Sequence, residues 1–338
     1  MSNGFRIAVS GTGGGAGQSV LKALAETDYE VVALDGEPLG TGLYTTNTSY
    51  VIPYANKPDF IDRVIEICQK ENIKIYFPGF DVELPILTQN VERFKAAGIT
   101  VVVSSPEVVE LSDNKQLTHD VLTQHGFNVP ETYSMAETDP HNIPLDYPFI
   151  LKERVGGARS LNLHKVKSKE QLDTLLESGI DLSNYVAQEY IDGDEYTCGS
   201  VNFDGTCYGV IVMRRILRDG DTYKCFSVRD ELIETEVKKI LEAIKPFGAC
   251  NVQLRVRDGK VYVFEINARC SGTTGARALC GFNEPKMIAD FLLQSKQPEY
   301  DIKELSILRY WKELVVENSL VETMKANGTL TQENPTKL

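Results

Sequence analysis

Residues 251–275 read NVQLRVRDGKVYVFEINARCSGTTG, and this stretch decides how the rest of the chain is interpreted. Two runs of alternating side chains flank Asp258-Gly259, a dipeptide typical of the two-residue turn of a β-hairpin. Because alternate residues of a strand point to the same side, the pattern predicts one face rich in amides and arginines, with a single carboxylate. The residues of that face are Asn251, Gln253, Arg255, Glu265, Asn267 and Arg269.

The chemistry of this face suits a metal–phosphate site. Oxygen ligands at positions i and i+2 of one strand, with another from the paired strand, suit a hard cation such as Mg²⁺. One carboxylate and two amides leave room for phosphate oxygens, and a neighbouring arginine would neutralise the charge that develops in phosphoryl transfer. A solvated edge hairpin explains the same alternation, and spacing alone slightly favours that purely structural interpretation.

Composition and charge limit the classes of partner. The 338 residues are 42% hydrophobic and carry a formal net charge of −13. This length can bury a substantial core in two or three domains. So acidic a surface argues against nucleic acid and against anionic membranes as partners. We find no apolar run long enough to span a bilayer and no signal-peptide pattern, so we expect a cytoplasmic protein.

Cysteine and histidine spacing excludes two further classes of site. The seven cysteines include no Cys-x-x-Cys pair, which makes a disulfide framework or a zinc site an unfavoured interpretation. The four histidines are not spaced as metal ligands either, and we assign them no role.

A glycine-rich loop marks the N-terminal region. It runs from Ser10 to Gly17, between a predicted strand at 5–9 and a predicted helix at 18–27, and the next strand ends at Asp35. Gly11-x-Gly13-x-x-Ala16 with an acid about twenty residues later fits the dinucleotide fingerprint. A tight strand–helix turn without a ligand explains the same glycines.

Strands and helices continue to alternate after this loop, with strands predicted at 49–53, 73–78 and 99–103 and a helix at 59–71. Asp81 and Glu83 follow the strand that ends at Pro78, where open α/β sheets face their ligand crevice. They could hold a substrate amine, or they could cap the next helix, which is the commoner use of acids there.

The hairpin motif Asn251-x-Gln253, then Glu265-Ile266-Asn267-x-Arg269-x-Ser271, resembles the Mg-ATP site of the ATP-grasp superfamily. It most resembles a single ATP-grasp unit of the carbamoyl phosphate synthetase large chain. This resemblance implies that Gln253, Glu265 and Asn267 bind Mg²⁺ (or Mn²⁺) and that Arg269 contacts the transferred phosphate or the acyl phosphate. The sequence departs from the synthetase pattern at Ala268, Cys270 and Gly272-Thr273, which bears on the acceptor and leaves the metal site intact.

Further motifs follow the order of the same family. Ser112 or Asp113 is predicted to cap a helix that runs to about His125, and the resemblance implies that Lys115 reaches the nucleotide phosphates. It also implies that Lys152 contacts the α- and β-phosphates and that the loop from Gly156 through Gly157 to Ser160 closes over the γ-phosphate. It further implies that Glu189, Tyr190 and Ile191 meet the adenine and that Glu195 binds the ribose hydroxyls. Arg215 would be the basic residue that binds the acyl phosphate.

The resemblance implies an α/β fold that is α+β in its ATP-grasp part. We expect a Rossmann-like domain at 1–111, a linker helix and lid at 112–187, and an ATP-grasp body at 188–338. Helices are predicted at 235–247 and 285–293, and the segment 304–316, which contains Trp311, is predicted to be β-like. The polar tail from Asn327 to Leu338 is expected to fray.

The function implied is an ADP-forming ligase. A substrate carboxylate would be activated by ATP as an acyl phosphate, and an amine, ammonia or thiol would then displace the phosphate. Many relatives are dimers, so a homodimer is expected by analogy. Three alternatives stay open: a split carbamoyl phosphate synthetase half that uses bicarbonate and ammonia, an NAD(P)-dependent oxidoreductase on the Gly11–Ala16 loop and Asp35, and a non-catalytic nucleotide-binding protein.

Overall fold

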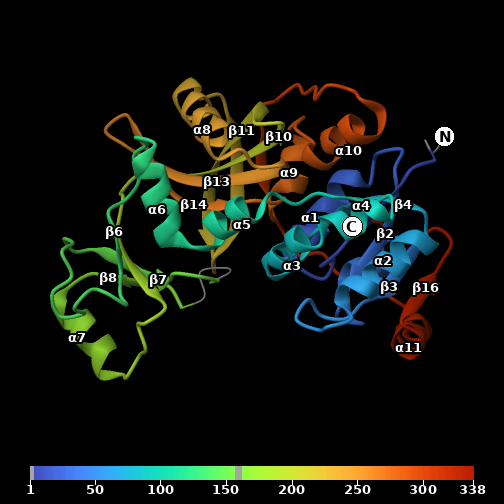
Figure 1. Cartoon of the computed structure of the whole chain (residues 1–338), viewed down its shortest axis with the longest axis horizontal. Coiled ribbons are helices and arrows are strands. Elements are labelled where there is room, and N and C mark those ends of the chain that lie inside the picture. The colour runs from blue at the N-terminus through green and yellow to red at the C-terminus, as the bar shows by residue number, and fades with distance from the viewer. Residues whose placement is uncertain (1–3, 157–161) are drawn as a thin grey trace.

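The computed structural model describes residues 4–156 and 162–338 and contains three β-sheets with helices packed around them (Figure 1). The N-terminal sheet lies at one end of the elongated molecule and a small four-stranded sheet lies at the other. A six-stranded sheet lies between them and carries the hairpin on which the sequence interpretation rests. No helix within the described ranges is long and apolar enough to cross a membrane.

The N-terminal sheet has the strand order β16-β3-β2-β1-β4-β5 and is parallel except at β16. Its strands are β1 (Arg6–Val9), β2 (Glu30–Asp35), β3 (Thr48–Val51), β4 (Ile73–Phe77), β5 (Thr100–Val101) and β16 (Thr329–Thr331). The helices and 3₁₀ turns of this region are α1 (Gly15–Leu24), η1 (Thr41–Tyr44), α2 (Phe60–Lys70), η2 (Asp81–Glu83), α3 (Leu84–Gln89) and α4 (Val91–Ala96). The chain order reverses between β1 and β4, and ligands bind at such a reversal in open α/β sheets.

Two helices lead to the small sheet. They are α5 (Pro106–Asp113) and α6 (Lys115–Gln124), and the side chain of Asn114 between them caps α6. The predicted cap at Ser112 or Asp113 is therefore wrong by one or two residues, because Asp113 still belongs to α5. The small sheet has the order β6-β9-β7-β8. Its elements are β6 (Thr132–Ser134), β7 (Phe149–Glu153), β8 (His164–Val166), α7 (Lys169–Glu177) and β9 (Tyr185–Glu189).

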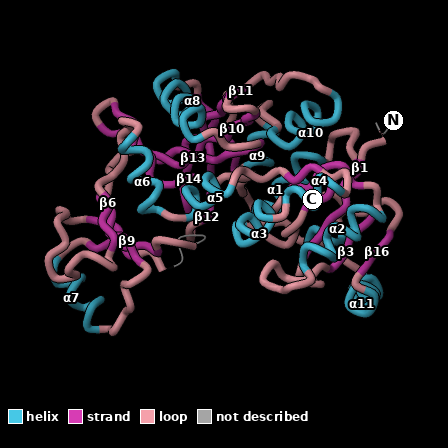
Figure 2. The backbone as a smooth tube through the Cα atoms, viewed as in Figure 1, coloured by secondary structure: helices cyan, strands magenta, loops and turns pink. Residues whose placement is uncertain are grey.

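The central sheet is antiparallel throughout, in the order β14-β13-β10-β11-β12-β15. Figure 2 shows its strands β10 to β14 between the small sheet and the N-terminal sheet. Its strands are β10 (Glu195–Phe203), β11 (Thr206–Arg218), β12 (Asp221–Val228), β13 (Gly248–Arg257), β14 (Lys260–Asn267) and β15 (Ser306–Leu308). The accompanying helices are α8 (Glu231–Ile244), α9 (Thr274–Leu279) and α10 (Glu284–Gln294). Asp258 and Gly259 join β13 to β14 with φ values of 52° and 69°, which confirms the predicted hairpin turn.

The C-terminal segment differs from its prediction. Only β15 is a strand within 304–316, and Trp311 is 91% exposed, because the chain leaves the central sheet there. The last residues do not fray. Instead α11 (Asn318–Asn327) leads into β16, which pairs with β3 at the edge of the N-terminal sheet (Figure 1). The buried side chains of Met324 and Leu330 hold this return in place.

One hydrophobic core joins the N-terminal and central regions. Val9 of β1 and Leu21 of α1 belong to the same cluster of buried side chains as Phe203 of β10 and Phe282 before α10. The small sheet has a separate core around Phe149 and Leu151. A shared core fixes the ends of β1 and β4 relative to the β13–β14 hairpin, and this arrangement positions the site.

Candidate functional site

The hairpin strands pair in the register that the sequence predicts. Asn251 lies opposite Asn267, and Gln253 lies opposite Glu265, so these four side chains share one face. The register then shifts, since Leu254 pairs with Val263 and leaves Phe264 as the extra residue of a β-bulge. A bulge next to the polar face frees the Phe264 carbonyl from the ladder for use by a side chain.

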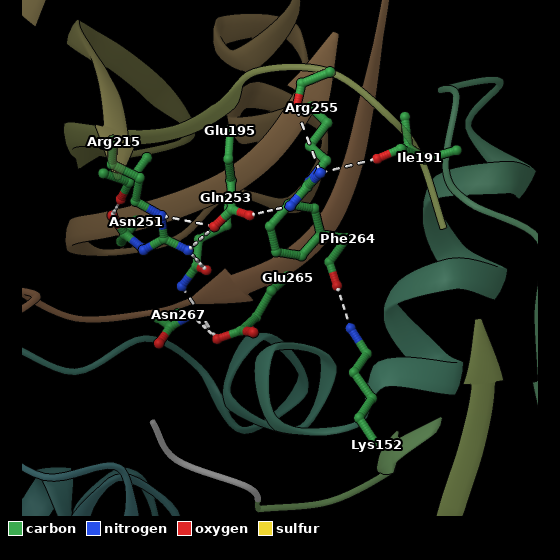
Figure 3. A network of polar contacts seen from close by, with 12 residues as sticks. Lys152, Ile191, Glu195, Arg215, Asn251, Gln253, Arg255, Phe264, Glu265 and Asn267 are labelled. Carbon is green, nitrogen blue, oxygen red and sulfur yellow. Dashed lines mark hydrogen bonds and ion pairs between the residues drawn. The ribbon is translucent and has the colours of Figure 1, made fainter. Parts of the chain in front are cut away.

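Glu265 is the centre of the polar face. Gln253 Nε2 and Asn267 Nδ2 donate hydrogen bonds of 3.2 Å and 3.0 Å to Glu265 Oε1 (Figure 3). The described part of the chain contains no group of three or more His, Cys, Asp or Glu side chains that could hold a metal ion. Gln253, Glu265 and Asn267 together contain one carboxylate and two amide oxygens, the ligand types of a hard cation that takes its remaining ligands from phosphate or water, and the two amide oxygens now accept from Arg215 and Arg269.

Two arginines share the carboxylate of Glu195. Arg215 donates to Glu195 Oε1 at 2.9 Å from Nε and 2.6 Å from Nη2, and Arg255 Nη2 donates to Oε2 at 2.7 Å. Arg215 Nη2 also donates to Gln253 Oε1, which links this pair to the polar face (Figure 3). Both carboxylate oxygens of Glu195 are thus already paired, and its role at the ribose stays a prediction.

Arg269 lies just beyond the end of β14 and is nearly buried. It forms an ion pair with Asp81 of η2, and its Nη2 donates to Asn267 Oδ1 at 3.0 Å. Asp81 therefore does not serve as a simple helix cap. Glu83, the neighbouring acid, is buried and accepts hydrogen bonds from Ser10 Oγ and Tyr76 OH.

Two buried lysines approach the polar face from the small sheet and from α6. Lys152 Nζ donates to the bulged Phe264 carbonyl at 3.1 Å (Figure 3). Lys115 Nζ donates to the Gly156 carbonyl at 2.8 Å. The pKa of Lys152 is lowered to about 8, mainly by burial and also by the positive charge of Lys115, against the opposing effect of the Glu265 and Glu195 carboxylates. Both ammonium groups donate to backbone carbonyls rather than to carboxylates, so no direct ion pair with a described residue competes with a phosphate chain for them.

A cavity of about 660 Å³ opens onto these groups. Its walls come from the polar hairpin face, the loops after β1 and β4, α5, and the turn between β11 and β12. Of the predicted site residues, it is lined by Lys115, Gly156, Arg215, Gln253, Glu265, Asn267 and Arg269. The predicted residues outside its lining are Lys152, Glu189, Tyr190, Ile191 and Glu195. Gly157 lies outside the described residues.

The predicted adenine residues form a cluster of their own. The Ile191 carbonyl and the Tyr190 hydroxyl both accept from Arg255 Nη1, at 3.2 Å and 3.1 Å. Glu189 forms an ion pair of 2.8 Å with Arg257. The assignment of these residues to the adenine stays a prediction, and Arg255, which the resemblance did not mark, organises them.

The glycine-rich loop donates a backbone hydrogen bond to the protein's own Asp35 side chain rather than to a ligand. Asp35 Oδ2 accepts from Gly13 N at 2.6 Å, and Asp35 Oδ1 accepts from Glu37 N at 2.9 Å. The ring of Phe80 covers the loop so closely that a Cβ atom added at Gly11 would lie 2.5 Å from it. The acid that would bind a ribose in a dinucleotide site is thus engaged by the loop itself, which argues against a dinucleotide here.

Sequence reasoning did not assign a role to the groups beneath Asn251. Asn251 Oδ1 accepts from Thr197 Oγ1 at 2.6 Å and also from Arg277, whose side chain is fully buried against Glu284. The polar group that Asn251 has left for the cavity is its Nδ2 amide. No short motif connects Arg277 to this face, because the contact arises from the packing of α9 beneath the sheet.

Two protein families match separate parts of the chain. Residues 7–102 match a family described as the PylC-like N-terminal domain. Residues 181–313 match a family described as ATP-grasp in the biosynthetic pathway with Ter operon. The second match contains the whole polar hairpin face together with Glu195, Arg215 and Arg309.

Related sequences and structures cover most of the chain. The carbamoyl phosphate synthase large chain of Caldanaerobacter subterraneus subsp. tengcongensis is 24% identical over 346 residues, which cover 92% of this chain and 31% of that protein. The chain spans between about a quarter and a third of the length of the curated relatives it matches.

Among solved structures, an ADP complex of N5-carboxyaminoimidazole ribonucleotide synthetase superposes with a TM-score of 0.72 at 14% identity and covers 96% of this chain and 85% of that one. The biotin carboxylase domain dimer of Hydrogenobacter thermophilus 2-oxoglutarate carboxylase, in complex with MgADP and bicarbonate, gives 0.66 at 15% identity, with 88% and 71% covered. At these identities the likeness establishes the fold. ATP-grasp enzymes use ATP and Mg²⁺, so the predicted cofactors are those of the matched family.

Proposed function

Because this chain is an ATP-grasp protein that resembles one unit of the carbamoyl phosphate synthase large chain, we propose that it is an ADP-forming ligase. Its substrates would be a small-molecule carboxylic acid and an amine, ammonia or thiol. One observation carries the proposal. Glu265, Lys115, Arg215 and Arg269, which come from distant parts of the sequence, line one cavity.

The residues fit the nucleotide and its cation. Gln253, Glu265 and Asn267 would hold Mg²⁺, whose charge shields the phosphate oxygens and lets a weak oxygen nucleophile approach the γ-phosphorus. For this, the amide groups of Gln253 and Asn267 would have to turn their oxygens toward the cation, since both now donate to Glu265. Lys115 and Lys152 would pair with the phosphate chain.

In the first step a carboxylate oxygen of the acid attacks the γ-phosphorus of ATP. The bond from this phosphorus to the β–γ bridging oxygen breaks, ADP leaves with that electron pair, and an acyl phosphate forms. Arg269 lies beside Asn267 and would bind the oxygens that gain charge. The protein contributes mainly placement and preorganised charge, because both arginines are already fixed by carboxylates.

In the second step the nucleophile adds to the acyl carbon, loses a proton, and phosphate leaves with the electrons of the C–O bond. Arg215 would stabilise the leaving phosphate, and its place in the cavity lining and its contact with Gln253 support this role. Exclusion of water protects the acyl phosphate at this stage. We extend the proposal to a homodimer, the state named for the Hydrogenobacter thermophilus domain, which sedimentation would test.

The test is ADP release from Mg-ATP with pools of carboxylic acids, each offered with ammonia, with an amino-acid mixture or with a thiol. Bicarbonate with ammonia forms a separate arm, because the curated relatives are carbamoyl phosphate synthases. Glu265→Gln should abolish acid-dependent ADP release, whereas Glu242→Gln on the exposed side of α8 should not change it. A wild-type chain that binds Mg-ATP and releases no ADP with any pool would favour a non-catalytic nucleotide-binding protein.

A further inference from the structure

A third arginine lines the cavity, and the proposed mechanism does not use it. Arg309 follows β15 and is half-buried at the cavity wall. Its backbone N–H donates to the Tyr223 carbonyl at 3.2 Å, and its Nη1 donates to the Thr222 carbonyl at 2.8 Å. These contacts attach Arg309 to the tip of the β11–β12 hairpin, which lines the same cavity through Gly220 and Thr222.

The arginines of the cavity differ in how their charge is balanced. Arg215 pairs with Glu195 at 2.6 Å and Arg269 pairs with Asp81. Arg309 forms no ion pair with any carboxylate of the described ranges, and its guanidinium donates to a neutral carbonyl, that of Thr222. The guanidinium of Arg309 is therefore not engaged by a carboxylate at the cavity wall, whose acidic residues are Asp81, Asp113, Asp221 and Glu265.

The surroundings of Arg309 are positive as well. Burial lowers the pKa of the Lys22 ammonium on α1, and the positive charges of Arg309 and Lys312 act in the same direction. The first turn of α1 supplies Gly15 and Ala16 to the cavity and contains no acidic residue. The positive end of this helix therefore adds to the potential on the same side.

We propose that Arg309 binds a second anionic group of the acid substrate. This inference rests on the proposed ligase function and names the substrate class, an acid with two anionic groups. One carboxylate would be activated beside Glu265 and Arg269, and the other group, a carboxylate or a phosphate, would pair with Arg309. Gly272 lines the same cavity and leaves room for a ligand there, since the nearest atom to a Cβ built on it, in Gly15, lies 3.9 Å away.

A purely structural role for Arg309 makes a different prediction. If Arg309 only tethers the hairpin tip, a substitution that removes its charge should change the KM for monoanionic and dianionic acids to the same extent. Arg309→Gln removes the charge and keeps a neutral amide donor on a shorter side chain. Arg218→Gln is the matched control, because Arg218 lies on the same hairpin, is 62% exposed and does not line the cavity.

The experiment measures kcat and KM for ADP release with acids that differ only in a second anionic group. The pairs are propionate with succinate, alanine with aspartate, and serine with phosphoserine, each with Mg-ATP and with ammonia, an amino-acid mixture or a thiol. We expect turnover with a dianionic member of a pair. Arg309→Gln should raise the KM for that acid on the order of 10²-fold and leave kcat within a few-fold, because the charge acts in binding rather than in the transfer.

Three results decide the matter. A raised KM in Arg309→Gln, with Arg218→Gln unchanged and with thermal stabilisation by Mg-ADP intact in both variants, supports the inference. Equal use of the monoanionic partner, or equal KM values in the two variants, overturns it while the ligase function stands. Absence of ADP release with every acid overturns the ligase function and this inference with it. The succinate and phosphoserine arms distinguish a carboxylate from a phosphate as the second group.

Discussion

Arg269 and Asp81 are 188 residues apart in the sequence and form a bidentate ion pair across the cavity wall. Arg269 Nε lies 2.7 Å from Asp81 Oδ1, and Arg269 Nη2 lies 2.5 Å from Asp81 Oδ2. The arginine follows the polar hairpin, whereas the aspartate follows β4 of the N-terminal sheet. The pair therefore ties the proposed acyl-phosphate residue to the other side of the crevice, and its two parallel bonds fix the plane of the guanidinium.

We expect Asp81→Asn to lower kcat by about 10²-fold and to leave nucleotide binding unchanged. The amide can accept only one of the two arginine hydrogen bonds, so Arg269 loses its fixed plane, and small misplacements at a reacting centre have effects of this size. The measurement is acid-dependent ADP release, with thermal stabilisation by Mg-ADP as the binding readout.

Asp62→Asn is the control for this change, because Asp62 also pairs with an arginine, Arg93, but on the exposed surface. Surface pairs of this kind contribute little to stability. An unchanged kcat in Asp81→Asn, or an equal loss in Asp62→Asn, would mean that the ion pair does not position Arg269 for catalysis.

Nucleotide affinity should fall as the pH rises above about 8. In the free protein, burial lowers the pKa of Lys152 to about 8, so its charge is lost progressively above that pH. An uncharged amine attracts phosphate far less than an ammonium group does, so the Kd for Mg-ADP should rise by about tenfold for each pH unit above 8. Isothermal titration between pH 7 and pH 9.5 measures this dependence.

Lys152→Met serves as the reference for that titration. Its affinity should be weaker than that of the wild type at pH 7 and should not fall further through the same range, because the titrating group is gone. A slope that persists in Lys152→Met would assign the pH dependence to another group.

The hairpin that carries the polar face could be predicted because all of its information is local. Asp258-Gly259 specifies the turn, and the turn fixes the register that sets Gln253 opposite Glu265. The Rossmann-like order of the first sheet also followed from alternating apolar runs. Local patterns of this kind determine which face a side chain occupies, and they predicted most of the cavity lining on the hairpin side.

Contacts between distant segments could not be predicted in this way. The pairing of Asp81 with Arg269 and the packing of Arg277 beneath Asn251 depend on how the two sheets share a core. The tail was expected to fray because its composition is polar, yet Leu330 is buried and β16 completes the edge of the N-terminal sheet. Two separated leucines, Leu330 and Leu338, in an otherwise polar tail are too weak a local signal to indicate a strand.

The dinucleotide alternative can be tested directly. In a dinucleotide site Asp35 would bind the ribose, but here its carboxylate accepts a hydrogen bond from Gly13 N of the loop. We expect NADH and NADPH to give no thermal stabilisation at millimolar concentration, whereas Mg-ADP at about 100 times its Kd adds roughly 2.7 kcal/mol. Asp35→Ala should destabilise the fold by about 1–3 kcal/mol through the lost hydrogen bonds to Gly13 and Glu37. Stabilisation by NADH that Asp35→Ala removes would revive the oxidoreductase interpretation.

Glu83 should make the stability of the protein depend on pH below neutrality. Burial raises the pKa of Glu83 to about 7, and the negative charges of Asp35 and Asp81 raise it too, against the hydrogen bonds from Ser10 and Tyr76. A carboxyl whose pKa is raised in the folded state binds its proton more tightly there than in the unfolded chain. Its contribution to stability is therefore complete below about pH 4.5 and is lost as the pH rises through 7.

Glu83→Gln should remove this dependence, because the amide is neutral at every pH and its oxygen can still accept from Ser10 and Tyr76. A pKa raised from 4.5 to about 7 corresponds to about 3 kcal/mol. The difference in free energy of unfolding, Glu83→Gln minus wild type, should therefore increase by about 3 kcal/mol between pH 4.5 and pH 7.5. Urea unfolding across this range measures the difference, with Glu92→Gln on the exposed side of α4 as the control. Parallel pH profiles for wild type and Glu83→Gln would mean that folding does not raise the pKa of Glu83, so that Glu83 carries its negative charge in the folded protein at neutral pH.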